Sequence, residues 1–292
     1  MSAHVSHRVI GYLATALWLM GVSGCSVEGP EGDNFSDVLV SGGLMRAYAV
    51  HVPGSYREDE PVPLLIAFHG VPDTGEGLRR GTGLDDLADE MGWVIAYPNA
   101  TSDWAEGCDG CARADREGVD DIQFVVDLID ALSERLTLDR HRVYAVGFSQ
   151  GGLFTQRIAC DLADKVAAVA VVAATLSVPL AEVCDPAQPI SVMIVHGMKD
   201  AVFPWEGQDN GNFSTLAARS AAFYWARKNQ CDTRGTTTND PPGTRGVELT
   251  SFDGCANGAE VRLYGVINGL HEWPSSFDVN TLIGTFLAPH SL

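Results

Sequence analysis

The sequence predicts one α/β domain with a mainly parallel central sheet and helices on both faces. Apolar runs such as Leu64–Phe68 and Ile190–Val195 show no alternation of polar and apolar residues. That pattern is typical of strands buried on both faces of a parallel sheet. Such runs alternate along the chain with segments of helical periodicity, which favours an α/β arrangement. The 292 residues, 46% of them hydrophobic, are enough for one domain with a large core.

The expected elements begin with an antiparallel hairpin, with strands at 38–40 and 45–52 on either side of Ser41-Gly42-Gly43. Further apolar runs predict strands at 93–97, 143–146, 166–172, 247–252 and 261–266. Apolar residues at helical spacing predict helices at 84–91, 119–136, 216–228 and 279–287, and one directly after residue 149. We expect 98–118 to be a long functional loop and 232–247 an exposed excursion.

The first 25 residues have the pattern of an export signal. A weakly cationic start with Arg8 precedes an apolar stretch that is too short for a comfortable membrane span. The stretch ends in Val22-Ser23-Gly24-Cys25, which resembles the lipoprotein box of bacteria. We expect a signal peptide over 1–24, a lipid on Cys25, a tether over 25–35 and one folded domain over 36–292. The protein would then be anchored at the outer membrane or cell surface. The alternative is an ordinary signal peptide and a secreted protein.

The charge balance limits the classes of partner. The chain has 19 Lys and Arg against 38 Asp and Glu, a formal net charge of -19. Such a surface repels nucleic acid and anionic lipid headgroups. We therefore expect no nucleic-acid partner and no membrane contact except through the lipid anchor. The acidic residues are spread along the chain, as is typical of a solvated surface, and we expect a monomer.

Six cysteines remain when Cys25 is set aside, and an even number in an exported chain indicates disulfides. Many connectivities are possible, and the order in the sequence makes the simplest set Cys108–Cys111, Cys160–Cys184 and Cys231–Cys255. The Cys108-Asp109-Gly110-Cys111 stretch could instead be a redox pair or half of a zinc site. It has no second Cys-x-x-Cys and lies in a loop rich in Gly and Asp, so a structural clasp is favoured.

The strongest motif is Gly147-Phe148-Ser149-Gln150-Gly151, which stands between a short apolar strand and a helix. A Gly-x-Ser-x-Gly turn in this context raises the serine hydroxyl above the sheet. The N-terminus of the following helix offers unpaired N–H groups to a developing oxyanion. The pattern therefore predicts a nucleophilic Ser149, whereas a tight turn with a surface serine is the alternative.

A serine hydroxyl needs a base within hydrogen-bond reach. In this strand–turn–helix arrangement the order along the chain is Ser, acid, His. His271 lies in a loop directly after a strand, whereas His290 is third from the end of the sequence, so we expect His271 to be the base. Asp200 closely follows the strand that ends at residue 195 and is the expected acid, with Asp253 as the alternative.

The oxyanion requires two main-chain donors. One is expected to be the N–H of Gln150, directly after the nucleophile. The second should come from the loop His69-Gly70-Val71 after the strand at 64–68, and we expect the Val71 amide. Gly70 would let the main chain approach closely.

Five segments together resemble a known family. They are Leu65–Gly70, Gly147–Gly152, Val195–Asp200, Tyr224-Trp225 with Cys231, and Gly269–Pro274. The resemblance is to exported α/β-hydrolases grouped as polyhydroxybutyrate depolymerases and feruloyl or acetylxylan esterases, the carbohydrate esterase family 1 type. It runs from about Val38 to Phe286. It implies an α/β-hydrolase fold with nucleophile Ser149, acid Asp200 and base His271, and disulfides 160–184 and 231–255. The chain departs from the family at Val71, where Cys is frequent, and at Leu270 and Glu272 beside the base.

The function expected from these residues is hydrolysis of carboxylic esters through an acyl-enzyme, without metal or cofactor. Feruloyl or acetyl esters of plant polysaccharide and hydroxyalkanoate esters are the expected substrates. A ligand-binding surface lipoprotein without activity and a serine peptidase are the alternatives. Trp104, Trp205 and Trp273 flank the expected site. They could stack on a sugar or a phenolic acyl group, or they could simply pack beside the loops.

Overall fold

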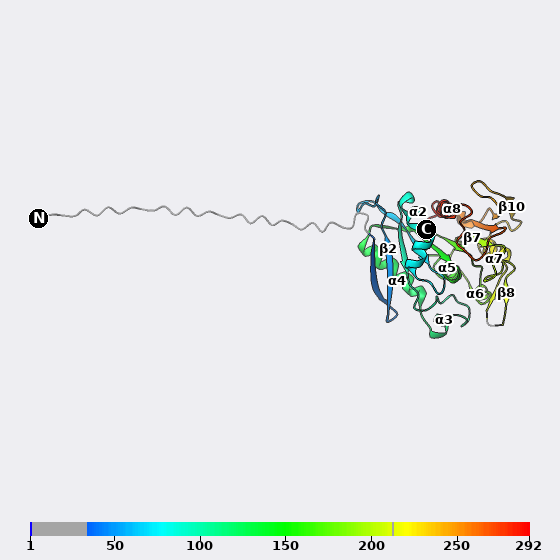
Figure 1. Ribbon diagram of the computed structural model, residues 1–292, viewed down its shortest axis with the longest axis horizontal. Coiled ribbons are helices and arrows are strands. Elements are labelled where there is room, and N and C mark those ends of the chain that lie inside the picture. Colours follow the sequence, from blue (N-terminus) through cyan, green and yellow to red (C-terminus); the bar gives the residue numbers. More distant parts are fainter. Residues whose placement is uncertain (2–33, 212) are drawn as a thin grey trace.

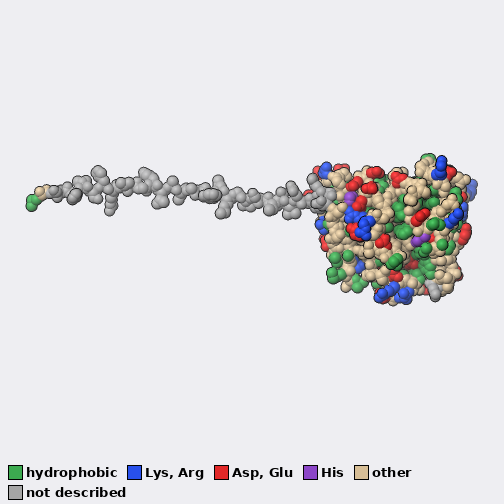
Figure 2. Space-filling model, in the orientation of Figure 1, with side chains coloured by type: hydrophobic (Ala, Val, Ile, Leu, Met, Phe, Trp, Pro, Cys, Tyr) green, Lys and Arg blue, Asp and Glu red, His purple; other side chains and the backbone are tan. Residues whose placement is uncertain are grey.

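The computed structural model describes residue 1 and residues 34–211 and 213–292. The expected signal peptide, the lipidation site Cys25 and almost all of the tether lie outside the described residues. The first strand begins at Phe35, at the expected end of the tether. On the face shown in Figure 2, acidic side chains are scattered among Lys and Arg, in line with the dispersed negative charge of the sequence.

A ten-stranded sheet forms the centre of the domain, in the order β1-β2-β4-β3-β5-β6-β7-β12-β11-β10. The six strands from β4 to β12 in this order pair in parallel, and antiparallel strands flank them on both sides. Strands β2 and β10 lie at opposite sides of the domain in Figure 1. The strand bounds are β1 Phe35–Ser41, β2 Leu44–His51, β3 Val62–Phe68, β4 Val94–Pro98, β5 Leu138–Phe148, β6 Ala168–Val172, β7 Ser191–Gly197, β10 Thr236–Asn239, β11 Val247–Phe252 and β12 Val261–Val266. A separate small pair consists of β8 Gln208–Asp209 and β9 Ser214–Thr215.

Helices cover both faces of the sheet, as the sequence predicts. Strand β3 shows how both faces are buried, since Leu64 and Ile66 face one core cluster and Leu65 faces the other. Helices α4, α5 and α7 pack in the first cluster, and α1, α2 and α8 in the second. The helix bounds are α1 Gly75–Thr82, α2 Leu84–Met91, α3 Arg113–Glu117, α4 Asp121–Arg135, α5 Gln150–Asp161, α6 Val178–Val183, α7 Ala218–Lys228 and α8 Val279–Leu287.

Several short elements were not predicted by the apolar pattern, among them α1, α3, α6 and β10. Helix α1 contains three glycines and buries only one large apolar side chain, Leu78, so it lacks an apolar stripe. Helices α3 and α6 are five and six residues long, which is too short for periodicity to show. Strand β10 lies in the expected excursion and all four of its residues are exposed. Pairing with β11, and not burial, defines this edge strand.

Three disulfides hold the surface segments, and their pairing confirms the simplest expected set: 108–111, 160–184 and 231–255. The second joins the end of α5 to the residue after α6, and the third joins the segment after α7 to the segment after β11. Within the described part of the chain, no helix combines the length and apolar character needed to cross a membrane.

Candidate active site

Ser149 stands at the tight turn between β5 and α5. Its backbone has φ 56° and ψ −124°, a strained conformation for a residue with a side chain. Glycines make the turn possible, because a Cβ at Gly147 would collide with the main chain of Gly151. The N–H of Ser149 donates to the carbonyl of Val172 (2.9 Å), which fixes the turn against β6. The strained backbone costs free energy locally, and it presents the Ser149 hydroxyl at the carboxyl end of the sheet.

Three side chains that are far apart in the sequence form one hydrogen-bonded chain. Nε2 of His271 lies 2.8 Å from Oγ of Ser149, and Nδ1 of His271 lies 2.8 Å from Oδ2 of Asp200. Asp200 follows β7 and His271 follows β12, which is the parallel neighbour of β7. The carboxyl ends of parallel strands thus bring the three groups together. Ser149 is 7% exposed, so the contact is shielded from bulk water.

Asp200 is held in place by the main chain of its own turn. Its Oδ1 accepts hydrogen bonds from the N–H groups of Val202 (2.8 Å) and Phe203 (2.9 Å), which leaves Oδ2 for His271. Burial alone would raise the pKa of this carboxyl, but the hydrogen bonds from His271, Phe203 and Val202 outweigh it and lower the pKa. Asp200 therefore stays ionised near neutral pH and orients one tautomer of the His271 ring.

A second buried histidine supports this turn. Nε2 of His196 lies 2.7 Å from the carbonyl oxygen of Phe203, and Nδ1 lies 3.1 Å from the carbonyl oxygen of Ala174. Its Nε2 is also 3.7 Å from Oδ2 of Asp200. Burial lowers the pKa of His196 in spite of these partners. His196 thus connects the acid-bearing turn to the end of β6, and it does not contact Ser149 through any of these bonds.

The expected oxyanion-hole residues lie beside the nucleophile. A Cβ placed on Gly70 would be 3.0 Å from the Cβ of Ser149, so the loop after β3 runs directly against the turn. Val71, which is 45% exposed, and Gln150 line the same cavity next to Ser149. The side chain of Gln150 has a further role that the sequence did not reveal. It donates to the carbonyl of Trp104 (2.6 Å) and accepts from its N–H (3.0 Å).

The three tryptophans differ in how far they reach solvent. Trp104 is fully buried, stacks on Phe154 with 5.1 Å between ring centroids and donates through Nε1 to the carbonyl of His69. The expectation that Trp104 contacts substrate is therefore wrong, because neither face of its ring is free. Trp205 is 8% exposed, and Trp273 is partly exposed and donates to Asn280 (3.0 Å). Neither Trp205 nor Trp273 is among the described residues that line the cavity beside Gln150. Their contact with substrate stays a prediction.

A cavity of about 590 Å³ is lined in part by Gln150, the residue that directly follows Ser149. Aromatic rings of Phe203 and Phe213, 5.7 Å apart, form part of its wall. Phe203 also faces the ring of His271, with 5.6 Å between centroids, which connects the cavity to the catalytic candidates. Sequence reasoning did not single out Phe203 or Phe213, since isolated aromatic residues in loops follow no periodic pattern. The complete lining is Val71, Asp103, Glu106, Cys111, Ala112, Gln150, Leu153, Phe203, Gln208, Asn210 and Phe213.

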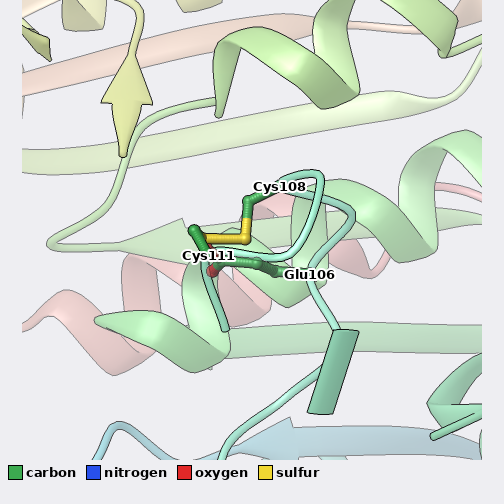
Figure 3. Close-up of side chains that lie close together, drawn as sticks. All are labelled: Glu106, Cys108 and Cys111. Carbon is green, nitrogen blue, oxygen red and sulfur yellow. A yellow bond between two sulfur atoms is a disulfide. The ribbon is translucent and has the colours of Figure 1, made fainter. Parts of the chain in front are cut away.

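Glu106, Cys108 and Cys111 form the one described cluster whose ligand atoms lie close enough for a metal, all within 4.8 Å (Figure 3). Both sulfur atoms belong to a disulfide. Zinc binds thiolates, and a disulfide sulfur is not one. The donor set therefore does not fit a metal in this state of the chain. The disulfide instead agrees with the expected structural clasp.

The comparisons with known proteins agree with this fold. Residues 46–205 match the family model described as Esterase PHB depolymerase, so the chain belongs to that family of α/β-hydrolase esterases. It is thereby a carboxylic ester hydrolase. NocK of Nocardia uniformis subsp. tsuyamanensis, a protein named as a candidate esterase, is 30% identical over 253 residues, which are 81% of this chain and 73% of NocK.

Two further relatives carry more specific names. Feruloyl esterase B of Piromyces equi is 27% identical over 77% of this chain, but this chain spans only 42% of that longer protein. Feruloyl esterase D of Neurospora crassa is 25% identical over 88% of this chain and 83% of its own. Among solved structures, the acetyl xylan esterase from Aspergillus awamori has a TM-score of 0.61 at 13% identity, covering 86% of this chain and 99% of that one. At this identity the likeness supports the fold alone.

Proposed function

We propose that the protein is a serine esterase in which Ser149 attacks the ester carbonyl and forms an acyl-enzyme. His271 takes the hydroxyl proton through Nε2 as the Ser149 oxygen attacks, and it then gives that proton to the leaving alcohol. Water enters next, and the same imidazole activates it to release the acid and regenerate Ser149. Asp200 keeps the proton on Nδ1 of His271 and stabilises the imidazolium that forms.

The main-chain N–H groups of Gln150 and Val71 are the proposed donors to the tetrahedral oxyanion. Gln150 begins α5, so its N–H belongs to a helix N-terminus, where the donors have no partner within the helix and the dipole favours negative charge. The close approach of Gly70 to Ser149 supports a position for Val71 on the opposite side of the carbonyl oxygen.

The observation that carries this proposal is the pair of 2.8 Å contacts that joins Ser149 to His271 and His271 to Asp200. A structural serine does not need a base that is itself oriented by a buried carboxylate. A strained backbone at Ser149 gives independent support, because such strain is maintained at functional sites.

The test is hydrolysis of a chromogenic acyl ester, together with covalent labelling by a fluorophosphonate. We expect Ser149→Ala to lose both, with a fall in kcat of at least about 10⁴-fold. Ser133→Ala is a matched control, because the Ser133 hydroxyl binds the carbonyl of Ile129 on α4 and touches none of the three proposed catalytic groups. Equal rates for wild type and Ser149→Ala would refute the mechanism.

Feruloyl or acetyl esters of plant polysaccharide are the proposed substrates, supported by the names of the relatives, and hydroxyalkanoate esters are supported by the family description. We also propose a monomer that is exported, with a signal peptide over 1–24, a lipidated Cys25, a tether over 25–35 and a catalytic domain over 36–292. Three disulfides support an oxidising compartment. Labelling with a radioactive or clickable fatty acid, compared with a Cys25→Ala variant, tests the anchor.

A further inference from the structure

The wall of the cavity contains a carboxyl group that the proposed mechanism does not use. Glu106 is only 2% exposed, and its Oε2 is buried without any hydrogen-bond partner. Glu106 nevertheless lines the 590 Å³ cavity together with Cys111 and Ala112. A buried acceptor without a partner costs free energy unless a ligand or a water molecule supplies the missing bond.

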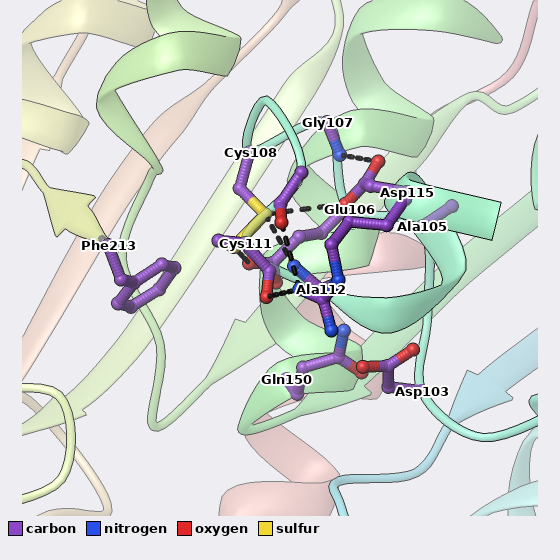
Figure 4. Close-up of a disulfide and its surroundings, with 12 residues drawn as sticks. Asp103, Ala105, Glu106, Gly107, Cys108, Cys111, Ala112, Asp115, Gln150 and Phe213 are labelled. Carbon is purple, nitrogen blue, oxygen red and sulfur yellow. Dashed lines mark hydrogen bonds between the residues drawn. A yellow bond between two sulfur atoms is a disulfide. The ribbon is translucent and has the colours of Figure 1, made fainter. Parts of the chain in front are cut away.

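The neighbours of Glu106 show in which form it is held. Figure 4 shows its carboxyl group behind the Cys108–Cys111 disulfide, and Oε1 lies 3.2 Å from Sγ of Cys111. A disulfide sulfur carries no hydrogen, so any hydrogen in this contact comes from the carboxyl group. Burial raises the pKa of Glu106 well above its usual value, and the negative charges of Asp115 and Asp103 add to the effect. The surroundings of Glu106 thus favour its uncharged carboxylic acid form.

The nearby cation does not neutralise Glu106. Arg157 donates to the carbonyl of Ala105 (2.6 Å) and pairs with Asp161 (3.1 Å) and Asp115 (3.8 Å). Among the described residues, no Lys, Arg or His lines the cavity, whereas Asp103 does. An anionic group that entered would meet the Asp103 carboxylate and no compensating charge. The cavity therefore fits an uncharged group.

The position of the cavity indicates which part of an ester enters it. Its lining includes both proposed oxyanion donors, Val71 and Gln150. Of the described residues, none in the 268–274 loop that carries His271 lines the cavity. The leaving oxygen must receive its proton from His271 and therefore departs toward that loop. The acyl group then occupies the opposite side, between Phe203 and Phe213 and within reach of Glu106.

We propose that Glu106 selects the acyl group of the substrate by hydrogen-bonding to a hydroxyl on it, and that the cavity rejects acyl groups that carry a negative charge. This proposal rests on the proposed esterase function. The ligand hydroxyl donates to the unpartnered carboxyl oxygen, while the carboxyl hydrogen stays on Oε1 and points toward Sγ of Cys111. The terminal torsion of a glutamate is broad and two-fold, so either oxygen can turn toward the cavity. The class of substrate is an ester of an apolar or aromatic acid with an uncharged hydroxyl.

Three methyl esters with one skeleton test this selection: cinnamate, 4-hydroxycinnamate and 4-carboxycinnamate. We expect wild-type kcat/KM to be about tenfold or more higher for the hydroxyl ester than for cinnamate, and lowest for the carboxylate. Glu106→Met should bring the ratio of the first two close to one, since Met has a similar volume and no hydrogen-bonding carboxyl. Glu106→Gln should keep the ratio, because its amide carbonyl offers the same acceptor without charge.

A wild type without preference for the hydroxyl ester, or a Glu106→Met variant that keeps the preference, would overturn the proposal. Turnover of plain cinnamate reports the Ser149 machinery separately in every variant, so loss of all hydrolysis in wild type counts against the esterase mechanism and not against Glu106. Calorimetry of the same esters with Ser149→Ala measures their relative affinities without turnover. Equal affinities for the hydroxyl and plain esters there would also contradict the role of Glu106.

Discussion

An Asp200→Asn substitution removes one charge from the chain of hydrogen bonds and leaves its shape nearly unchanged. Oδ1 of Asp200 accepts two main-chain N–H groups, so the amide oxygen of an asparagine must take that place. The amide nitrogen then faces Nδ1 of His271, where Oδ2 stood at 2.8 Å. Two donors cannot share this contact, so Nδ1 loses its hydrogen and Nε2 gains one.

The changed tautomer points an N–H at the Ser149 hydroxyl and removes the base. We expect kcat to fall about 10³- to 10⁴-fold, equivalent to about 4–5.5 kcal/mol of activation free energy. KM should change little, because Asp200 is buried and does not line the cavity among the described residues. The remaining rate comes from the proposed oxyanion donors and from positioning of the substrate.

Steady-state hydrolysis of a chromogenic ester by wild type and Asp200→Asn measures this effect. Asp253→Asn is the matched control, since Asp253 is the other acid that chain order allows but is exposed and 3.5 Å from Arg262. We expect the control to stay within about twofold of wild type. The reasoning is refuted if Asp200→Asn keeps more than a tenth of the wild-type kcat, or if Asp253→Asn is the variant that loses activity.

Three further predictions concern stability. Arg46→Met should lower the free energy of unfolding by about 3–5 kcal/mol, because it leaves the fully buried carboxylate of Asp121, now 2.6 Å from the guanidinium, without a partner. Denaturant titration measures this loss. The double variant Arg46→Met with Asp121→Leu should recover most of it. Replacing Cys160 and Cys184 by Ala opens a disulfide that spans 24 residues and should cost about 3 kcal/mol by the same titration, whereas no change would contradict a stabilising role. The lowered pKa of Asp200 stabilises the fold at pH values above the unfolded-state pKa of about 4, and this stabilisation is lost as the pH falls through the folded-state pKa. The free energy of unfolding of Asp200→Asn should therefore decline less than that of wild type between about pH 5 and about pH 3. These two pH values lie about one unit either side of the unfolded-state pKa.

Chain order and strand ends were sufficient to predict which residues meet at the site. Ser149, Asp200 and His271 each follow a strand of the parallel sheet, and parallel strands present their carboxyl ends on one edge. Once the strands are found, three loops far apart in the sequence must therefore converge. The structure brings these three side chains into hydrogen-bond contact, and their catalytic roles remain proposals for the variants above.

The side-chain contacts that support the cavity wall could not be predicted in the same way. Asp121 at the start of α4 is buried and binds Arg46 from β2. Trp104 was expected to flank the site, with packing beside the loops as the alternative, and its ring fills the core. Such contacts join side chains from segments that follow no common period, so neither helical nor strand spacing reveals them. Glu106 escaped notice for the same reason.

The loop at 98–118 is fixed by the same helix that begins at the nucleophile. Gln150, the first residue of α5, makes two hydrogen bonds to the main chain of Trp104, and Arg157, two turns later, donates to the carbonyl of Ala105. Asp121 at the start of α4 accepts the N–H of Ala105 (2.8 Å). The residue after these anchors is Glu106. The position of the proposed selectivity group relative to Ser149 is therefore set by two helices, α5 and α4, and not by a free loop. This support lets a cavity wall without regular secondary structure discriminate between acyl groups.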